Sequence, residues 1–222
     1  CGIMDMFASV MGKDAQVIQL DCRDLSFQYF PLNLGDYKIV LFDTGVKHSL
    51  AGGEYNLRRE QCELGAAVLQ QRFPEVKSLR DAQLSMLDDA FRASVPEVVY
   101  KRCLYVIEEN IRLEQGCSLL LQNDINGFGN KMYGSHKGLS ELYEVSCDEL
   151  DFLVTLAQKE KSIAGARMMG GGFGGCTINL IKTDEVHEIY DRFRQQYQAV
   201  MGKELKMYVT VPSEGAQLVN FD

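Results

Sequence analysis

The sequence of 222 residues predicts a mixed α+β fold. Near its start, short segments rich in β-branched and aromatic residues alternate with polar turns, which is typical of strands. Further along, apolar residues recur at helical spacing. A strand, a helix and a second strand then follow one another near the end. Strands and helices that are only partly interleaved favour a fold in which both kinds of element share the core.

The first three predicted elements are strands at residues 16–21, 26–31 and 37–44. Polar turns separate them, and each holds several β-branched, aromatic or other apolar residues. We therefore expect the first 45 residues to be mostly sheet.

The periodicity changes to helical after residue 45. Leu57, Gln61, Leu64 and Val68 recur on one face, whereas the other positions, beginning with Arg58, are largely charged. This pattern predicts a helix whose face with Leu57, Gln61, Leu64 and Val68 points toward the core.

Two later helices are predicted from signals at their N-termini. Ser94 and Glu97 have the spacing of a capping box, so we expect a helix from about residue 94 to about residue 114. Ser146 and Glu149 repeat that spacing at the start of another helix. Its buried stripe is expected to comprise Leu150, Leu153, Val154 and Ala157.

The last sixty residues predict a strand at 176–181, a helix and a strand at 206–211. Gly202 stands where a helix most easily ends in a left-handed residue. In the final strand Met207, Val209 and Val211 alternate with other residues, as in a half-buried strand. The apolar face of the helix comprises Val186, Ile189, Tyr190, Phe193, Tyr197 and Val200.

The composition excludes several classes of protein. Hydrophobic residues make up 46% and charged residues 24%, as in ordinary folded domains. A net charge of -8 offers no basic surface for nucleic acid or for an anionic membrane. No apolar run reaches the roughly 20 residues that span a bilayer, and no export signal is present. The seven cysteines form no Cys-x-x-Cys pair, so we expect reduced thiols in a cytoplasmic protein. We expect the protein to be a monomer.

Residues 165–176 contain six of the chain's 20 glycines. Glycine tolerates positive φ and lets backbone N–H groups approach a ligand or another loop closely. Gly170, Gly172 and Gly175 formally satisfy the dinucleotide pattern G-x-G-x-x-G, but that pattern opens a helix and this one opens a strand. The chain has no G-x-x-x-x-G-K-[ST] phosphate loop either. We therefore expect a functional loop of another kind.

The other polar candidates are Asp5, residues 46–59 and two histidines, and each could have a structural or a functional role. Asp5 lies among apolar residues, so it is solvated, caps a helix or carries a function. Residues 46–59 collect a cation, an imidazole, a hydroxyl and a phenol, which form either a site or a polar loop with a solvated basic face. His136 and His187 have no second histidine at ligand spacing, which favours structural roles.

Taken in order, the motifs resemble the galactokinase branch of the GHMP small-molecule kinases. Residues 1–5 (Cys-Gly-Ile-Met-Asp) resemble the segment that bears the family's catalytic aspartate, and residues 46–63 resemble the galactokinase-specific stretch that follows. Residues 165–177 resemble the third family motif, a glycine-rich loop that lines the active site. Residues 135–151 also match a segment typical of this branch.

The resemblance implies a fold and a reaction. Residues 1–45 would end the GHMP N-terminal domain, which is ribosomal protein S5 domain 2-like, and residues 46–222 would form the ferredoxin-like C-terminal domain. The reaction would be phosphorylation of α-D-galactose at O1 by ATP with Mg²⁺. Asp5 would be the base, Gly2 a backbone contact to the sugar, and Tyr55 a hydrogen-bonding partner of a ring hydroxyl. The glycine loop would close on the phosphate side, through Gly170, Gly171, Gly172, Gly174 and Gly175.

The sequence also departs from the family pattern. Met6 stands where the family usually has glutamine, and Met169 where it has threonine. The family's sugar-binding segment, its Ser-rich ATP loop and its magnesium ligands would lie before Cys1, and none of the residues present is a metal ligand. We therefore expect a C-terminal portion of a galactokinase that does not phosphorylate sugar unaided.

Three alternatives stay open. The chain could belong to a GHMP kinase for another sugar, such as N-acetylgalactosamine, or for a small alcohol. It could belong to a regulator that senses galactose without catalysis, or it could be an unrelated α+β binding domain.

Overall fold

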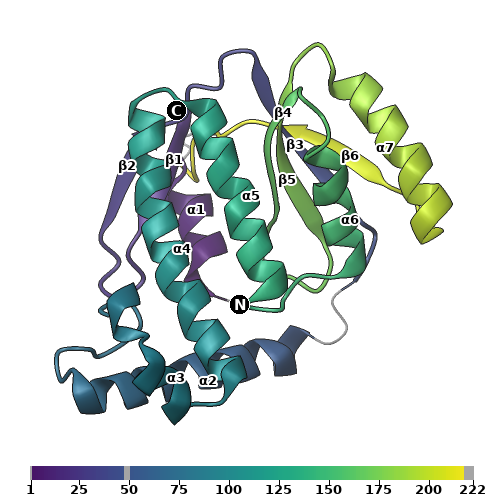
Figure 1. Ribbon diagram of the computed structural model, residues 1–222. Coiled ribbons are helices and arrows are strands. Elements are labelled where there is room, and N and C mark those ends of the chain that lie inside the picture. Colours follow the sequence, from purple (N-terminus) through teal and green to yellow (C-terminus); the bar gives the residue numbers. More distant parts are fainter. Residues whose placement is uncertain (1, 48–50, 218–222) are drawn as a thin grey trace.

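A computed structural model describes residues 2–47 and 51–217 of the chain. Cys1, His48, Ser49 and Leu50, which belong to the segments singled out above, lie outside these ranges. Helices and strands share the core, so the predicted α+β class is confirmed (Figure 1). None of the helices in the described ranges combines the length and the apolar character needed to cross a lipid bilayer.

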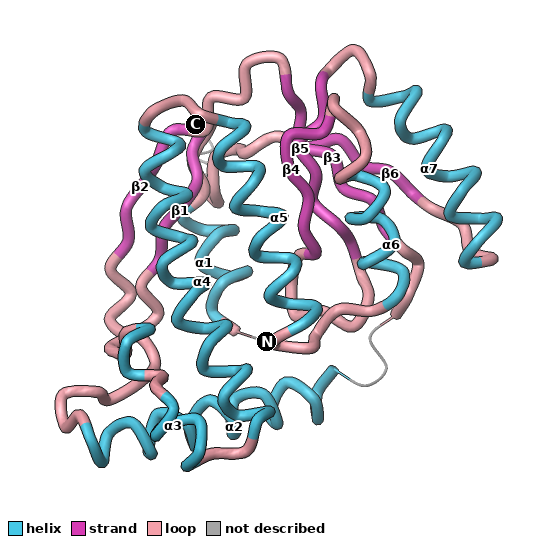
Figure 2. Tube along the Cα trace, viewed as in Figure 1, coloured by secondary structure: helices cyan, strands magenta, loops and turns pink. Residues whose placement is uncertain are grey.

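The order of elements is helix and sheet first, helices next, then the remaining sheet (Figure 2). The first part contains α1 (Ile3–Met11), β1 (Gln16–Leu20), β2 (Phe27–Pro31) and β3 (Tyr37–Asp43). The middle contains α2 (Ala51–Arg72), a short 3₁₀ helix η1 (Leu84–Met86), α3 (Asp89–Ser94), α4 (Glu97–Leu121), α5 (Ile125–Glu141) and α6 (Asp148–Ala157). The last part contains β4 (Ile163–Met168), β5 (Cys176–Lys182), α7 (Val186–Met201) and β6 (Lys206–Thr210).

Four strands form one antiparallel sheet in the order β4-β5-β3-β6. β3 comes from the first part of the chain, yet it pairs with β5 over its whole length, from Tyr37 opposite Lys182 to Asp43 opposite Cys176. β1 and β2 form a separate antiparallel hairpin. Residues 37–43 therefore belong to the same sheet as the end of the chain.

The central strands are apolar on both faces because helices cover both. On β3, Val40 and Phe42 point to one side, where they pack with α6 and α7. Ile39 points to the other, with Leu120 of α4 and Met132 of α5. Successive side chains of a strand alternate between its faces, so one strand supplies two cores. The sheet lies between two layers of helix (Figure 1).

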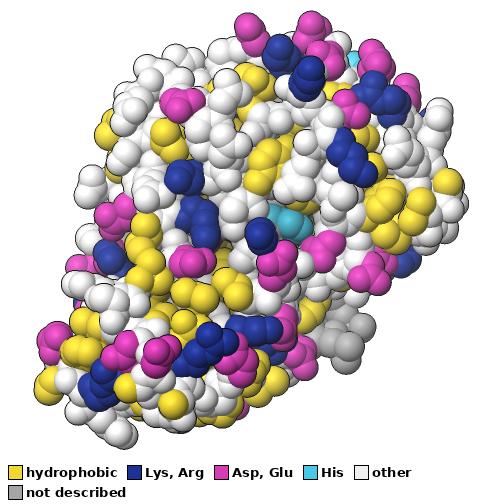
Figure 3. Space-filling model, in the orientation of Figure 1, with side chains coloured by type: hydrophobic (Ala, Val, Ile, Leu, Met, Phe, Trp, Pro, Cys, Tyr) yellow, Lys and Arg dark blue, Asp and Glu magenta, His cyan; other side chains and the backbone are white. Residues whose placement is uncertain are grey.

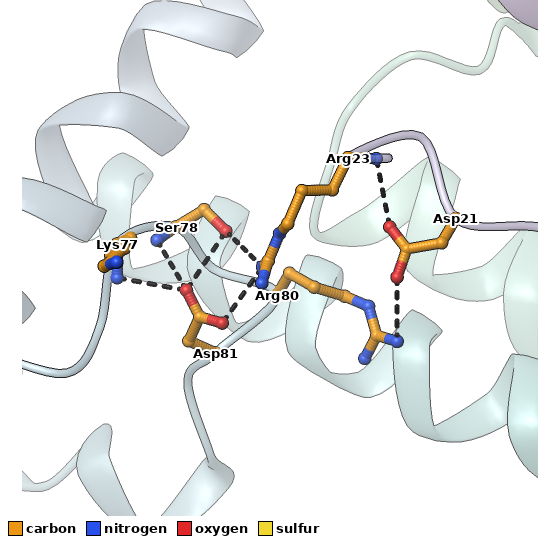
Figure 4. A network of polar contacts seen from close by, with 6 residues as sticks. All are labelled: Asp21, Arg23, Lys77, Ser78, Arg80 and Asp81. Carbon is orange, nitrogen blue, oxygen red and sulfur yellow. Dashed lines mark hydrogen bonds and ion pairs between the residues drawn. The ribbon is translucent and has the colours of Figure 1, made fainter. Parts of the chain in front are cut away.

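A polar network joins the β1–β2 turn to the segment before η1 (Figure 4). Arg23 Nη2 lies 2.9 Å from Asp81 Oδ1, and Arg80 Nη2 lies 3.3 Å from Asp21 Oδ2. The backbone N–H groups of Lys77 and Ser78 donate to Asp81 Oδ2. These exposed pairs orient the turn more than they stabilise it, since exposed ion pairs are typically worth less than about 1 kcal/mol.

The predicted strands at the start of the chain are confirmed, but residues 3–11 form α1, so the expectation of mostly sheet is wrong there. The predicted helices are confirmed, with different ends. α4 begins at Glu97 behind an uncapped Pro96, because Ser94 ends α3 and its Oγ donates to the Phe91 carbonyl. In α6, Cys147 occupies the N-cap, and the Ser146 hydroxyl donates to Asp151. Both predicted capping boxes are therefore wrong.

The predicted faces were confirmed where the apolar stripe was strong. All four stripe residues of α6 are buried, and Gly202 ends α7 with φ 66°. The face of α2 is wrong: Leu57 and Leu64 are 41% and 49% exposed, and Arg58 is buried instead.

Val200 in the last turn of α7 is also exposed, as are Val209 of β6 and Val211 just after it. β6 is an edge strand, paired with β3 alone within the described sheet, so less of it is covered. α5 and β4 were not predicted.

Candidate functional site

The glycine-rich loop joins β4 to β5, between Met168 and Cys176. One of its ends is anchored to the segment that follows β3. The Thr44 N–H and hydroxyl both donate to the Gly175 carbonyl, at 3.0 and 2.7 Å. The Gly175 N–H donates to the Val46 carbonyl at 3.2 Å. The loop is thus fixed to the start of residues 46–63, which we call the second family-like segment.

The other anchor is the segment between α5 and α6. The Phe173 N–H donates to the Val145 carbonyl at 2.7 Å. A Cβ on Gly172 would lie 2.0 Å from that same oxygen, and Gly172 has φ +86°. A Cβ on Gly174 would lie 2.7 Å from the Val46 carbonyl oxygen. Two glycines of the cluster are therefore required by close packing between backbones.

Gly170 and Gly171 differ from their neighbours in the loop. Nothing in the described chain lies within 4 Å of a Cβ built at either position. Packing against this chain therefore does not require glycine at Gly171, and at Gly170 only the backbone, with φ +74°, favours it. A loop that is rigid at its anchors and open at its tip can present backbone N–H groups to an anion. This tip is the part of the loop with room for a ligand.

Tyr55 lies on the first half of α2, one turn before Arg58. Its side chain is 60% exposed. It lines a cavity of about 560 Å³ together with Cys62 of the same helix and Tyr143. Tyr55 therefore faces open space, and Arg58 on the same helix reaches into the core.

Arg58 is not part of a solvated basic face, as one reading of the sequence had it. It is 7% exposed, and its Nε and Nη2 donate to the carbonyls of Tyr143 and Glu144, both at 2.8 Å. Its Nη1 lies 3.0 Å from Glu54 Oε2. The structure thus brings the second family-like segment against the segment that anchors the glycine loop.

His136 positions the entry to the loop. The Met168 N–H donates to His136 Nδ1 at 3.1 Å, so Nε2 faces Asp151 Oδ1, 3.1 Å away. Asp151 also accepts hydrogen bonds from the hydroxyls of Ser140 and Ser146. Burial alone would raise the pKa of Asp151, but the neighbouring His136 and the hydrogen bonds from the two serines together lower it. The structural role expected for His136 agrees with this placement.

We expect Asp151→Asn to lower the stability at pH 7 by about 1 kcal/mol, because it weakens the two serine hydrogen bonds to the carboxylate and its contact with His136. A carboxyl whose pKa is depressed by folding stabilises the fold above its unfolded pKa of about 3.9. That contribution disappears as the pH falls through the lower, folded pKa. Urea unfolding from pH 7 to pH 3 should therefore show the variant and the parent converging in acid. Asp148→Asn, an exposed change at the start of the same helix, serves as the control, and an equal loss in both variants would contradict the assignment.

Asp5 and Gly2 lie on a separate element. Gly2 is the N-cap residue of α1, and Asp5 lies in the first turn of that helix. Asp5 is exposed, and its backbone carbonyl accepts a hydrogen bond from Ser9. Met6, next to it, is also exposed, as is Met169 at the start of the glycine loop.

Sequence reasoning missed Arg102 and Glu144. Arg102 is 1% exposed, and its Nη2 lies 2.6 Å from Glu144 Oε2. The guanidinium lowers the pKa of the Glu144 carboxyl by hydrogen bonding. A signal was present, because Arg102 interrupts the otherwise apolar stripe of Val99, Cys103 and Val106 on α4. A charge at such a position needs a partner.

Two other features of the surface do not coincide with the candidate residues or favour a different kind of ligand. A cavity of about 890 Å³ lies between the β1–β2 hairpin and α4, and none of the candidate residues lines it. Basic and acidic side chains are interspersed over the face shown in Figure 3. That pattern is unlike the single-signed surface that binds a polyanion.

The chain is similar to known kinases. Residues 118–199 match the family model "GHMP kinases C terminal". The chain is 38% identical to the galactokinase of Thermotoga neapolitana, over 99% of its own length and 60% of that protein. It is 36% identical to the galactokinase of Clostridium beijerinckii, over 99% of its own length and 56% of that protein. The chain therefore spans little more than half the length of these curated relatives.

The structure is also similar to solved structures of kinases. The galactokinase of Lactococcus lactis complexed with galactose matches with a TM-score of 0.89 and 32% identity, over 97% of this chain and 55% of that one. The mevalonate kinase of L. major in complex with R-mevalonate matches with a TM-score of 0.52 and 16% identity, over 90% of this chain and 50% of that one, which supports the fold alone.

Proposed function

Because this chain carries a GHMP kinase C-terminal domain and is similar to galactokinases over 99% of its length, we propose that it belongs to an ATP-dependent galactokinase. The reaction is transfer of the terminal phosphoryl group of ATP to O1 of α-D-galactose. The observation that carries the proposal is the structural match, at TM-score 0.89, to a galactokinase complexed with galactose. The kinase is proposed to be monomeric and cytoplasmic.

Each candidate residue receives a role in this proposal. Phosphoryl transfer depends mostly on positioning and on charge stabilisation, with one group that orients or deprotonates the attacking hydroxyl. We assign that group to Asp5, and a backbone contact to the sugar to Gly2. Tyr55 has an exposed ring and phenol, which suit the C–H face and a hydroxyl of a sugar.

The glycine loop is assigned to the phosphate side. Its anchors near Gly172 and Gly175 hold it rigidly, and its tip at Gly170 and Gly171 has space for a ligand. Backbone N–H groups at such a tip suit the oxygens of ATP phosphates. This arrangement supports the assignment of all five glycines, three of them as part of the support and two as the contact.

The kinase is proposed to use Mg²⁺, but the described residues do not form a site for it. No three carboxylate, imidazole or thiolate side chains gather in residues 2–47 and 51–217 where they would hold a metal. Following the family pattern, we propose that the magnesium ligands, the sugar-binding segment and the Ser-rich ATP loop lie in another part of the kinase. We expect these residues to be inactive by themselves.

The proposal also divides the chain into an N-terminal part, residues 1–45, and a GHMP C-terminal domain, residues 46–222. The position of β3 in the four-stranded sheet favours a boundary somewhat earlier, before Tyr37.

The experiment is ATP-dependent phosphorylation of galactose, glucose and N-acetylgalactosamine. It uses this chain within a polypeptide of the relatives' full length, and the 222 residues alone for comparison. We expect galactose 1-phosphate from the longer polypeptide and none from the shorter. Preference for N-acetylgalactosamine would indicate a GHMP kinase for another sugar, and product from the 222 residues would contradict their proposed incompleteness.

One observation favours a second candidate, a galactose sensor without catalysis. Met6 and Met169 replace polar residues of the family pattern, and both are exposed. If the longer polypeptide binds galactose and ATP but forms no product, we would assign it as a galactose sensor and no longer as a kinase. Restoring the family residue at position 6 by Met6→Gln would then test whether catalysis was lost through that substitution.

A further inference from the structure

Four consecutive backbone carbonyls, those of residues 142–145, are all occupied by hydrogen bonds from distant parts of the chain. Arg102 Nη1 donates to the Leu142 carbonyl. Arg58 donates to the carbonyls of Tyr143 and Glu144. The fourth carbonyl, that of Val145, accepts the Phe173 N–H of the glycine loop. The two arginines and the loop therefore bind one continuous stretch of backbone.

This stretch needs support, because its backbone is strained. Glu144 has φ +54°, and Phe173 on the facing loop has φ +61°. A residue with a Cβ adopts such a conformation only where its surroundings hold it there, at a cost of about 1–3 kcal/mol. At Glu144 both the carbonyl and the carboxylate are held, by Arg58 and Arg102 respectively.

Both guanidinium groups are themselves fixed. Arg102 Nε donates to Gln61 Oε1 at 3.1 Å, and Arg58 lies 6.0 Å from the centre of the Phe173 ring. Gln61 and Arg58 are one turn apart on α2, whereas Arg102 is on α4. Two packed helices thus set the shape of residues 142–145. A planar fork with several donors can do this, and a lysine cannot reproduce it.

We propose that Arg58 and Arg102 are positioning residues for the glycine-rich loop, acting through residues 142–145. This inference rests on the proposed function for its catalytic consequence, but its structural part is independent of it. Tyr55 and Arg58 lie one turn apart on α2, so the same helix carries the proposed sugar contact and a support of the phosphate-side loop.

The structural test is hydrogen–deuterium exchange of the 222-residue chain, with Arg58→Ala and the milder Arg58→Lys. The loop has two anchors, and only one depends on Arg58. We expect the Phe173 amide, which donates to Val145, to exchange about tenfold faster in both variants. The Gly175 amide, which donates to Val46, and the amides of β5 should keep their rates. Arg59→Lys is the control, because Arg59 is the next residue and pairs with Glu63 at the surface.

The exchange rates distinguish local support of the loop from general stabilisation of the fold. A uniform rise at both anchors and in β5 would mean that Arg58 only stabilises the fold, and unchanged exchange at Phe173 would also overturn the proposal. Arg58→Lys keeps the test valid if Arg58→Ala does not fold.

The catalytic test uses the full-length polypeptide. Arg58→Lys should lower kcat/KM for ATP by about 10- to 100-fold, since small misplacements of a positioning group have such effects. The KM for galactose should stay within about twofold of the parent value, as it should in Arg59→Lys. If the unsubstituted polypeptide makes no product, the proposed function fails while the exchange experiment still decides the positioning role. If it turns over and Arg58→Lys changes both KM values equally, the positioning role fails alone.

Discussion

Replacing Asp5 with alanine is expected to reduce galactose phosphorylation by the full-length polypeptide by about 10²- to 10⁴-fold. The reason is the loss of the carboxylate proposed to orient and deprotonate the attacking hydroxyl. The effect should fall on kcat, because Gly2 and Tyr55 would still contact the sugar. The measurement is steady-state formation of galactose 1-phosphate, with galactose binding followed separately by calorimetry.

The control for Asp5 is Asp14→Ala, which removes an exposed carboxylate just after the end of α1. It should leave kcat unchanged. Turnover by Asp5→Ala within about twofold of the parent would contradict the assignment of the base. Loss of galactose binding together with turnover would instead make Asp5 a binding residue.

The largest effect on stability is expected from Gly129→Ala. Gly129 lies on α5, where the helix touches β4: a Cβ at this position would lie 2.0 Å from the Ala164 carbonyl oxygen. A Cβ on Gly165 of β4 would in turn lie 2.3 Å from the Gly129 Cα. Because both obstacles are backbone, the helix must move away from the sheet. We expect a loss of about 3 kcal/mol, at the upper end of the overpacking range.

Thermal unfolding measures this effect, with an expected fall in Tm of about 6–12 °C for a chain of this size. Gly134→Ala on the same helix is the matched control. The nearest atom there is the flexible Arg112 side chain, at 3.2 Å, so the higher helix propensity of alanine should dominate. That variant should be unchanged or more stable by up to about 1 kcal/mol. Equal Tm values for the two variants would show that the contact between α5 and β4 can relax.

The sequence predicted elements well where one kind of interaction dominated. The stripe of α6 and the face of α7 near Phe193 are strongly apolar, and burial of apolar area determines the orientation of such helices. α2 has a weak pattern, so its orientation follows its partners. Arg58 turns inward because two backbone carbonyls, a carboxylate and an aromatic ring surround its guanidinium there. No periodicity on α2 alone contains that information.

The missed helix α5 illustrates another limit. Its sequence contains four glycines, at positions 127, 129, 134 and 138, and glycine disfavours a helix by about 1 kcal/mol each. The tertiary structure explains two of them, because Gly129 allows the contact with β4 and a Cβ on Gly138 would meet the Tyr105 ring at 2.7 Å. The packing gain offsets the poor propensity.

The sequence by itself determined the α+β class and the strand β5 that follows the glycine loop, and the resemblance of its motifs to the GHMP kinases suggested the candidate residues. These features depend on local composition, periodicity and short motifs. Only the tertiary structure decided which residues support the loop. Arg58, Arg102 and residues 142–145 are far apart in the chain, and their contacts form only when α2 and α4 pack together. A guanidinium and a carbonyl carry no mark in the sequence of the partner they will bind, so such a network depends on the fold that desolvates both.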